Sequence, residues 1–193
     1  MPSRRGWVLV LFLVPALGGG PARAEEEILI ERIPAVVDGR PLMLTEVRFL
    51  GRLRGLEDAA AIEALIDERL MFREASRLPQ AAVSGDEEEK AYQDLAARVL
   101  PELRAAAEGD LRRLARRQTA ILKYIDFRLR PQVRITDEEV RAAYETQRAT
   151  QPDRTYEEVA PALRRTLEAR QLDERIEAWV KDLRQTSDIR YNR

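Results

Sequence analysis

Apolar residues recur along most of the chain at the spacing of amphipathic helices. Four stretches show this pattern most clearly, at about residues 57–78, 84–103, 109–129 and 155–184. In the third stretch the apolar stripe includes Ile121 and Leu122, and the arginines on its other faces look solvated: Arg112, Arg113, Arg116 and Arg117. The pattern predicts a mainly α-helical fold built from several helices.

Residues 28–44 have a different pattern, which favours short strands. Asp38-Gly39 lies between two apolar runs, and this dipeptide favours the positive φ angles of a type I′ hairpin turn. Pro34 and Pro41 cannot donate to a ladder, so we expect short or edge strands. Residues 187–191 alternate weakly and could add a last strand to this hairpin. The sequence therefore predicts a small N-terminal β-hairpin beside the helices.

Local signals predict where the helices begin and end. Thr45 is expected to cap a short helix that ends at Gly55, and Ser84 to open another. Capping boxes start at Thr136 and Thr155. Between the last two helices, residues 146–154 look like a polar linker. We therefore expect one domain, in which residues 25–145 form a helical core and residues 155–193 add a helix and strand that complete it.

Residues 1–24 have the order of a secretory signal peptide. Arg4 and Arg5 precede an apolar run, and a small-residue site ends at Ala24, just before Glu25. The run is shorter than the roughly 20 apolar residues of a spanning helix. We therefore expect cleavage after Ala24, a periplasmic location and no stable membrane insertion. The paired arginines leave the twin-arginine route open, although the general secretory route fits better because nothing suggests a cofactor loaded before export.

Charge and composition exclude several kinds of function. The chain has 33 basic and 34 acidic residues, and loss of the three arginines in residues 1–24 leaves 30 against 34, a net charge near −4. This balance gives no pull towards nucleic acid. Cysteine and histidine are both absent, which removes the usual metal ligand, the commonest general base and all Ser-His or Cys-His nucleophiles. We expect no catalytic residue, metal or cofactor, although carboxylate or lysine chemistry remains formally possible.

The order of these segments resembles the N-terminal region of the SurA-type periplasmic chaperones. The match is carried by residues 35–39 with 42–47 (AVVDG and LMLTEV), by residues 65–75 (LIDERLMFREA) and by residues 133–145 (VRITDEEVRAAYE). The last helix, with Trp179, and the trailing residues 189–191 look like the family's C-terminal helix and strand, which return to complete the N-terminal core.

The chain departs from that family in one large respect. Members usually insert one or two parvulin-type isomerase domains of about 90 to 100 residues where this chain has only the linker 146–154. The parvulin active site uses histidines, which are absent. The resemblance therefore implies the chaperone core without the isomerase, and no catalytic residue carries over.

That resemblance implies an ATP-independent chaperone that binds unfolded or nascent exported polypeptides, outer-membrane proteins in particular. Adaptable methionine and aromatic side chains suit such binding. We select as candidate peptide-binding residues Met43, Phe49, Met71, Phe72, Tyr92, Tyr124 and Phe127. Ordinary core packing is the competing interpretation for each of them. An alternative function is an isomerase-related accessory subunit for export or assembly with one dedicated protein partner; the sequence leaves the oligomeric state open.

Overall fold

The computed structural model describes residues 32–101, 104, 107–148 and 154–192. The expected signal peptide, its cleavage site at Ala24 and Glu25, and most of the expected linker lie outside the described residues. Among the helices that are described, none is both long and apolar enough to cross a membrane.

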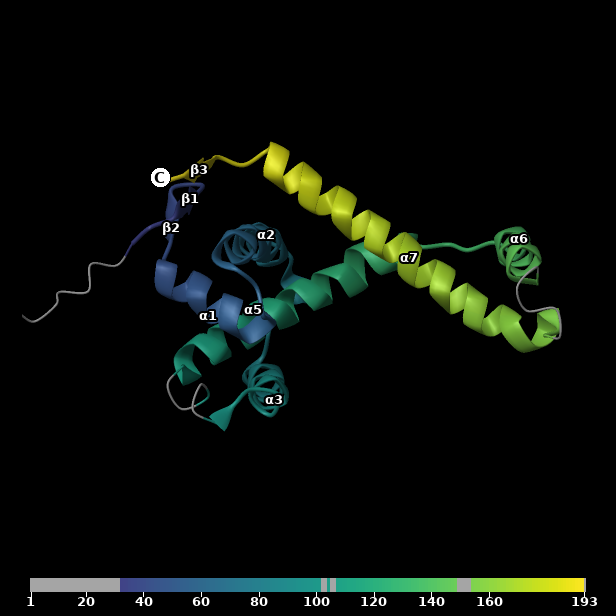
Figure 1. The fold of residues 1–193 in the computed structure, drawn as a ribbon, viewed down its shortest axis with the longest axis horizontal. Coiled ribbons are helices and arrows are strands. Elements are labelled where there is room, and N and C mark those ends of the chain that lie inside the picture. The colour runs from purple at the N-terminus through teal and green to yellow at the C-terminus, as the bar shows by residue number, and fades with distance from the viewer. Residues whose placement is uncertain (1–31, 102–103, 105–106, 149–153, 193) are drawn as a thin grey trace, which may run out of the picture. The chain divides into compact units, whose positions relative to one another are not determined.

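The described chain is mainly helical, as the sequence predicts, with a small antiparallel sheet (Figure 1). In chain order the elements are β1 (Ala35–Val37), β2 (Arg40–Leu42), α1 (Leu44–Arg54), α2 (Asp58–Ala75), the 3-10 turn η1 (Pro79–Ala81), α3 (Gly85–Ala96), α5 (Glu108–Tyr124), the π-helical turn η2 (Ile125–Leu129), the 3-10 turn η3 (Arg130–Gln132), α6 (Asp137–Arg148), α7 (Tyr156–Gln185) and β3 (Ile189–Tyr191).

The sheet joins the two ends of the described chain. Its strand order is β2-β1-β3, and Val36 lies opposite Pro41 on one side and Arg190 on the other. Asp38 and Gly39 have φ angles of 48° and 76°, as a type I′ turn requires. The Asp38 backbone N–H donates to the Asp188 carbonyl at 2.8 Å. The predicted hairpin and its C-terminal strand are therefore confirmed.

The largest apolar cluster lies where the sheet meets α1, α2, α5 and α7. Its buried members come from the two hairpin strands, three helices and the end of α7: Ala35, Val37, Leu42, Val47, Leu50, Ala61, Leu65, Ile66, Leu70, Leu114 and Leu183. Ile189 of β3 and Trp179 of α7 pack against them. Burial of this kind stabilises by about 25 cal/mol per Å² of apolar surface, so both ends of the described chain contribute to one core.

Most predicted helix ends are correct, and three need correction. Thr45 lies inside the first turn of α1, and Met43 occupies the N-cap position with φ −90° and ψ 140°. The reason is that β2 ends at Leu42, so the chain turns into the helix two residues before Thr45. The helix expected from residue 84 ends at Ala96, where tight 3-10 bonds replace the α-helical ladder. Residues 146–148, expected in the linker, continue α6.

The two predicted capping boxes begin α6 and α7. Thr136 Oγ1 accepts the Glu139 N–H at 3.3 Å while a Glu139 carboxylate oxygen accepts the Thr136 N–H at 2.7 Å. Glu158 similarly accepts the Thr155 N–H at 3.2 Å. These bonds satisfy amides that the first turn of a helix leaves unpaired.

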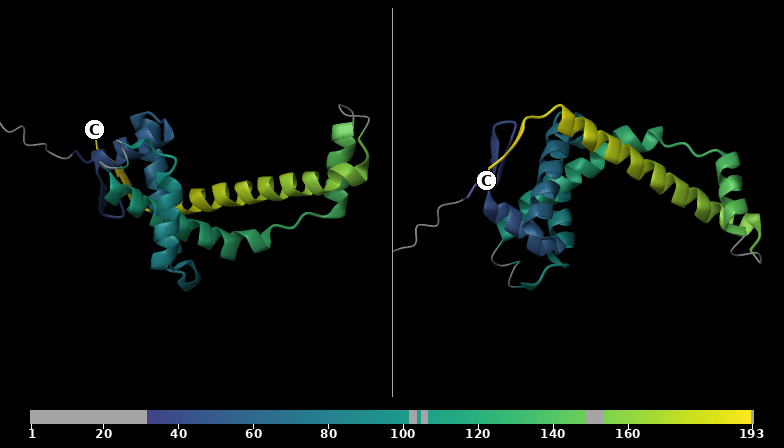
Figure 2. Two further views of the ribbon diagram at one scale, coloured as in Figure 1. Left: turned by 90° about the horizontal axis from the view of Figure 1, so that it is seen from below. Right: turned by 45° about the horizontal axis from the view of Figure 1, so that its top comes forward.

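Helix α7 has different neighbours along its length. Its N-terminal part packs on α6, where Tyr144 and Tyr156 meet edge to face with ring centroids 5.5 Å apart. Its C-terminal part packs on α2 and η2, and the views in Figure 2 show α6 beside only the N-terminal end. This change of neighbour accounts for the rotation of the apolar stripe from Val159 towards Ile176 and Leu183.

Candidate functional site

Three of the seven candidate residues come together where α2, α5 and α7 meet. The Tyr124 ring stacks on Trp179 with centroids 4.6 Å apart and planes 9° apart. Met71 and Phe72 pack on the same apolar cluster as Trp179, and Phe72 also lies with Tyr124. Stacked aromatic pairs add about 0.5–1.5 kcal/mol beyond area burial. These side chains are half-buried, so they both hold the helices together and reach the surface.

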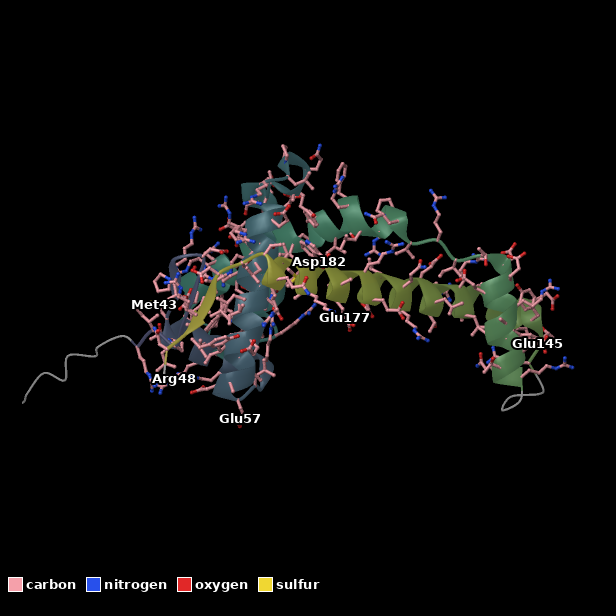
Figure 3. The ribbon with its side chains drawn as sticks, turned by 90° about the horizontal axis from the view of Figure 1, so that it is seen from above. Met43, Arg48, Glu57, Glu145, Glu177 and Asp182 are labelled. Carbon is pink, nitrogen blue, oxygen red and sulfur yellow. The ribbon has the colours of Figure 1, made fainter. Side chains whose placement is uncertain are left out.

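The other four candidates lie apart from this junction. Met43 begins α1 beside the sheet, away from the labelled α7 residues in Figure 3, and Phe49 of α1 packs on the main core. On α3, Tyr92 lies under the Arg112 guanidinium, whose central carbon is 4.0 Å from the ring centroid. Phe127 of η2 is 49 % exposed. The seven residues therefore do not form a single binding surface.

A pocket of about 420 Å³ opens between α1, α2 and α5; we name it the α2–α5 pocket. Its apolar lining consists of Ala64 and Met71 from α2 with Ile121 and Leu122 from α5. The sequence pattern placed Ile121 and Leu122 together in the stripe of α5, but only Ile121 is buried, at 7 % exposure, while Leu122 is 60 % exposed. Adjacent helical positions point about 100° apart, so one of the two had to leave the core.

The polar wall of the α2–α5 pocket contains a buried carboxylate. Glu68 is 2 % exposed, and its Oε1 accepts a hydrogen bond from Arg117 Nε at 2.6 Å. Its Oε2 lies 3.6 Å from Arg54 Nη2 and has no hydrogen-bond donor among the described residues. Removing one partner from a buried pair leaves an uncompensated charge, which is strongly destabilising. Glu68 therefore belongs to the framework that shapes the pocket.

This pairing corrects the expectation that the arginines of the third stretch are all solvated. The Arg117 side chain is only 11 % exposed because it reaches across to Glu68. Arg112 and Arg116 pair with Glu89 and Glu88 of α3 at 2.6 and 3.2 Å. The spacing of apolar residues places these arginines on the polar faces of α5. It cannot show that α2 and α3 pack beside two of those faces and supply carboxylates to the arginines.

A second ionic network fixes the C-terminal segment on the same stretch of α2. Asp67, which also lines the α2–α5 pocket, accepts from Arg184 Nε at 2.5 Å, and Glu63 accepts from Arg184 Nη2 at 2.8 Å. Burial lowers the pKa of Arg184, but the bonds to Asp67 and Glu63 raise it by more, so the guanidinium pKa lies above its ordinary value. The network keeps α7 against the pocket wall.

The Tyr191 hydroxyl joins this network from β3. It donates to Glu63 Oε2 at 3.2 Å. Burial, followed by the hydrogen bond to Glu63, raises the pKa of the phenol above 10.0. The hydroxyl therefore remains a donor at neutral pH, and β3 is tied to α2 as well as to β1.

Half-exposed ion pairs join α3 to α5. Lys123 Nζ contacts both carboxylate oxygens of Glu87 at 2.8 and 2.9 Å. The side-chain bond from Lys123, followed by the Ser84 backbone bond, lowers the pKa of Glu87. Bonds from Arg112 and then Gln93 lower the pKa of Glu89. These contacts orient α3 on α5 and lie outside the α2–α5 pocket.

The described part of the chain brings no three histidine, cysteine, aspartate or glutamate side chains together in a way that could hold a metal ion. What the arrangement offers chemically is an open apolar pocket with a fixed polar wall. Such a site can bind side chains of a polypeptide.

Comparison with known proteins adds no family to this description. No protein-family model matches the chain, and no curated protein matches its sequence. The inference of function therefore rests on the residues and geometry of the α2–α5 pocket.

Proposed function

We propose that this protein is an ATP-independent chaperone that holds unfolded, exported polypeptides in the periplasm, outer-membrane proteins among them. The observation that carries the proposal is the exposed Leu122 beside Met71 in an open pocket of about 420 Å³. An exposed leucine at a pocket rim loses water when a client side chain enters. Burial of one leucine side chain contributes about 1.5–3 kcal/mol.

The character of this pocket favours weak binding of varied clients. Methionine is unbranched and polarizable, so Met71 can adapt to side chains of different shape. A single contact of this size holds a client only loosely, and an unfolded chain presents many apolar side chains in succession. Repeated weak contacts along one chain raise the overall affinity without tight binding at any position.

The composition supports binding rather than catalysis. The sequence has no histidine and no cysteine, so the commonest acid-base and nucleophilic groups are missing. The net charge near −4 expected after export also suits a partner recognised by apolar contact rather than through a phosphate backbone.

The test is suppression of aggregation by protein purified from cells expressing the full chain. A urea-unfolded outer-membrane protein would be diluted into buffer without nucleotide, and light scattering would report aggregation. We expect suppression near stoichiometric ratios and no activity in a parallel proline-isomerisation assay. Leu122→Ser should weaken client binding about tenfold, since roughly 1.4 kcal/mol of burial corresponds to a factor of ten.

Leu100 provides the matched control. It is 73 % exposed, compared with 60 % for Leu122, and lies outside the pocket lining. Leu100→Ser therefore removes an exposed leucine away from the pocket and should leave suppression unchanged. Equal effects of the two substitutions would contradict the role of the pocket. No suppression by the unmodified protein, together with one tight stoichiometric complex in cell extracts, would replace the chaperone with the dedicated-partner function.

A further inference from the structure

A second pocket lies on the other flank of α2, against the β1–β2 hairpin; we name it the hairpin–α2 pocket. Its volume is about 470 Å³, and four arginines line it: Arg40, Arg69, Arg73 and Arg77. Asp38 is the only carboxylate among the lining residues. A pocket with this many guanidinium groups is suited to an anion, because each guanidinium presents a planar fork of donors.

The carboxylates around this pocket do not use up the arginine donors. Arg69 pairs with Glu46, Arg73 pairs with Asp38 and donates to Ser187 Oγ at 3.0 Å, and Arg77 pairs with Glu74 at 2.9 Å. The Arg40 side chain forms no hydrogen bond or ion pair with any residue that the structure describes. Four guanidinium groups therefore face three carboxylates, and one positive charge is left over.

Two buried donors next to this pocket also lack acceptors. The Nε atoms of Arg69 and Arg73 are buried and have no hydrogen-bond partner in the described chain. Such unpaired donors are costly in a folded protein. The two arginines are four positions apart on α2, so they are neighbours on one helix face. The Nε atoms themselves are closed to solvent. A carboxylate has about four acceptor sites, so one bound in the pocket would accept from the other guanidinium nitrogens of these two side chains.

Apart from Ser76, the rest of the lining is apolar. Phe72 and Leu70 of α2 face Val37 and Leu42 of the hairpin. A ligand that fits both parts must carry its anionic group and a sizeable apolar group close together. Free phosphate or an isolated acidic side chain would use the arginines and leave the apolar lining unfilled.

The edge of the sheet beside this pocket is a poor template for strand addition. Val37 and Arg40 flank the two-residue turn and form a hydrogen-bonded pair. The next β2 residue, Pro41, therefore has its backbone groups directed away from β1, towards the open edge of the sheet. Proline has no N–H to donate. A polypeptide strand added at β2 would therefore lack the N–H donor of Pro41, which favours recognition by side chains.

We propose that the hairpin–α2 pocket binds the C-terminal residue of a polypeptide, with the terminal carboxylate on the arginines and an apolar last side chain beside Phe72. In a protein, only the C-terminal residue carries a backbone carboxylate next to its own apolar side chain. The Asp38 carboxylate accepts from Arg73 and, at 3.0 Å, from the Asp188 N–H. A carboxylate has about four acceptor sites, so Asp38 can also accept from the peptide N–H of that residue, a group that a fatty acid lacks. This inference rests on the proposed function, which supplies the unfolded polypeptide as the ligand. It adds which part of that polypeptide the hairpin–α2 pocket recognises.

The test measures binding of labelled ten-residue peptides by fluorescence anisotropy, with protein purified from cells expressing the full chain. One peptide ends in Leu-Phe with a free carboxylate, and its twin is amidated at the C-terminus. We expect the free acid to bind about tenfold more tightly than the amide. Arg40→Gln should weaken binding of the free acid about fivefold and leave the amide unaffected.

Arg48→Gln is the matched control, because Arg48 is an exposed arginine of α1 outside the pocket (Figure 3). Equal binding of acid and amide, or equal losses with Arg40→Gln and Arg48→Gln, would overturn the proposal. Displacement of the peptide by a long-chain fatty acid at lower concentration would overturn the assignment to a polypeptide terminus. Aggregation suppression is a separate measurement. If suppression fails while the free acid still binds more tightly than the amide, only the chaperone function is contradicted. If suppression succeeds and acid and amide bind equally, only the assignment of this pocket is contradicted.

Discussion

The two flanks of α2 bear pockets of similar size but opposite polar character. Met71 lines the α2–α5 pocket and its neighbour Phe72 lines the hairpin–α2 pocket. On the first flank the central polar group is Glu68, which is 2 % exposed and bonded to Arg117. On the second flank the polar groups are arginines such as Arg69 and Arg73, whose side chains are 32 % and 30 % exposed.

This difference separates polar groups that build the fold from polar groups that remain available. A buried ion pair has already lost its water and depends on its partner, so removing either group is strongly destabilising. A half-exposed pair gains little from its partner and can exchange it for a ligand. The α2–α5 pocket is thus an apolar surface on a fixed ionic frame, whereas the hairpin–α2 pocket presents its charges to whatever enters.

The largest effect that this contrast predicts is on stability. Glu68→Gln should lower the free energy of unfolding by about 3 kcal/mol, because Arg117 would keep its charge in a buried site without a counter-charge. Urea denaturation measures the change. Arg77→Gln on the opposite flank removes a guanidinium that is 68 % exposed and should cost under about 0.5 kcal/mol. Similar losses of unfolding free energy for the two substitutions would contradict the distinction between the two flanks.

The next effect concerns the C-terminal segment behind the α2–α5 pocket. Arg184→Gln should lower the free energy of unfolding by about 1–2 kcal/mol, because Asp67 and Glu63 would lose a charged, part-buried donor. Hydrogen exchange should show faster opening of β3 and the end of α7 while α3 is unchanged. Uniform acceleration across α3 and β3 would contradict a local role for this network.

The smallest predicted effect concerns a half-exposed pair outside both pockets, Glu87 with Lys123. In the folded protein the pKa of Glu87 is lowered, mainly by the hydrogen bond from Lys123. Ionised Glu87 therefore stabilises the fold at pH values above its unfolded pKa, and this stabilisation is lost as the pH falls through the folded pKa. Glu87→Gln should therefore slightly reduce the decline of stability on acidification below pH about 4.5. Unfolding curves at several acidic pH values measure this slope, and a steeper decline in the variant would contradict the assignment.

Features set by local chemistry could be predicted from the sequence. The Asp38-Gly39 turn and the caps at Ser84, Thr136 and Thr155 depend on residues within one helical turn of each other, and all four are confirmed. Thr45 is the exception, because the end of β2 rather than the capping preference of threonine decides where α1 begins.

The candidate site depends on contacts between distant residues, and there the sequence pattern is insufficient. Glu68 and Arg117 are 49 positions apart, and nothing in the spacing of charges on either helix links them. The stripe of α5 likewise cannot decide which of Ile121 and Leu122 faces the core. Met71 was selected as a candidate for its chemistry, but its place in an open pocket follows only from the packing of α5 on α2.

The most direct test of the central claim is site-specific photo-crosslinking to an unfolded outer-membrane protein. A photoreactive amino acid would replace Leu122 in the α2–α5 pocket or, in the control protein, Leu100 outside it. The account predicts strong crosslinks from position 122, loss of these crosslinks when the client is folded, and few crosslinks from position 100. Equal crosslinking from the two positions, or none from position 122, would contradict the claim that this pocket holds unfolded polypeptides.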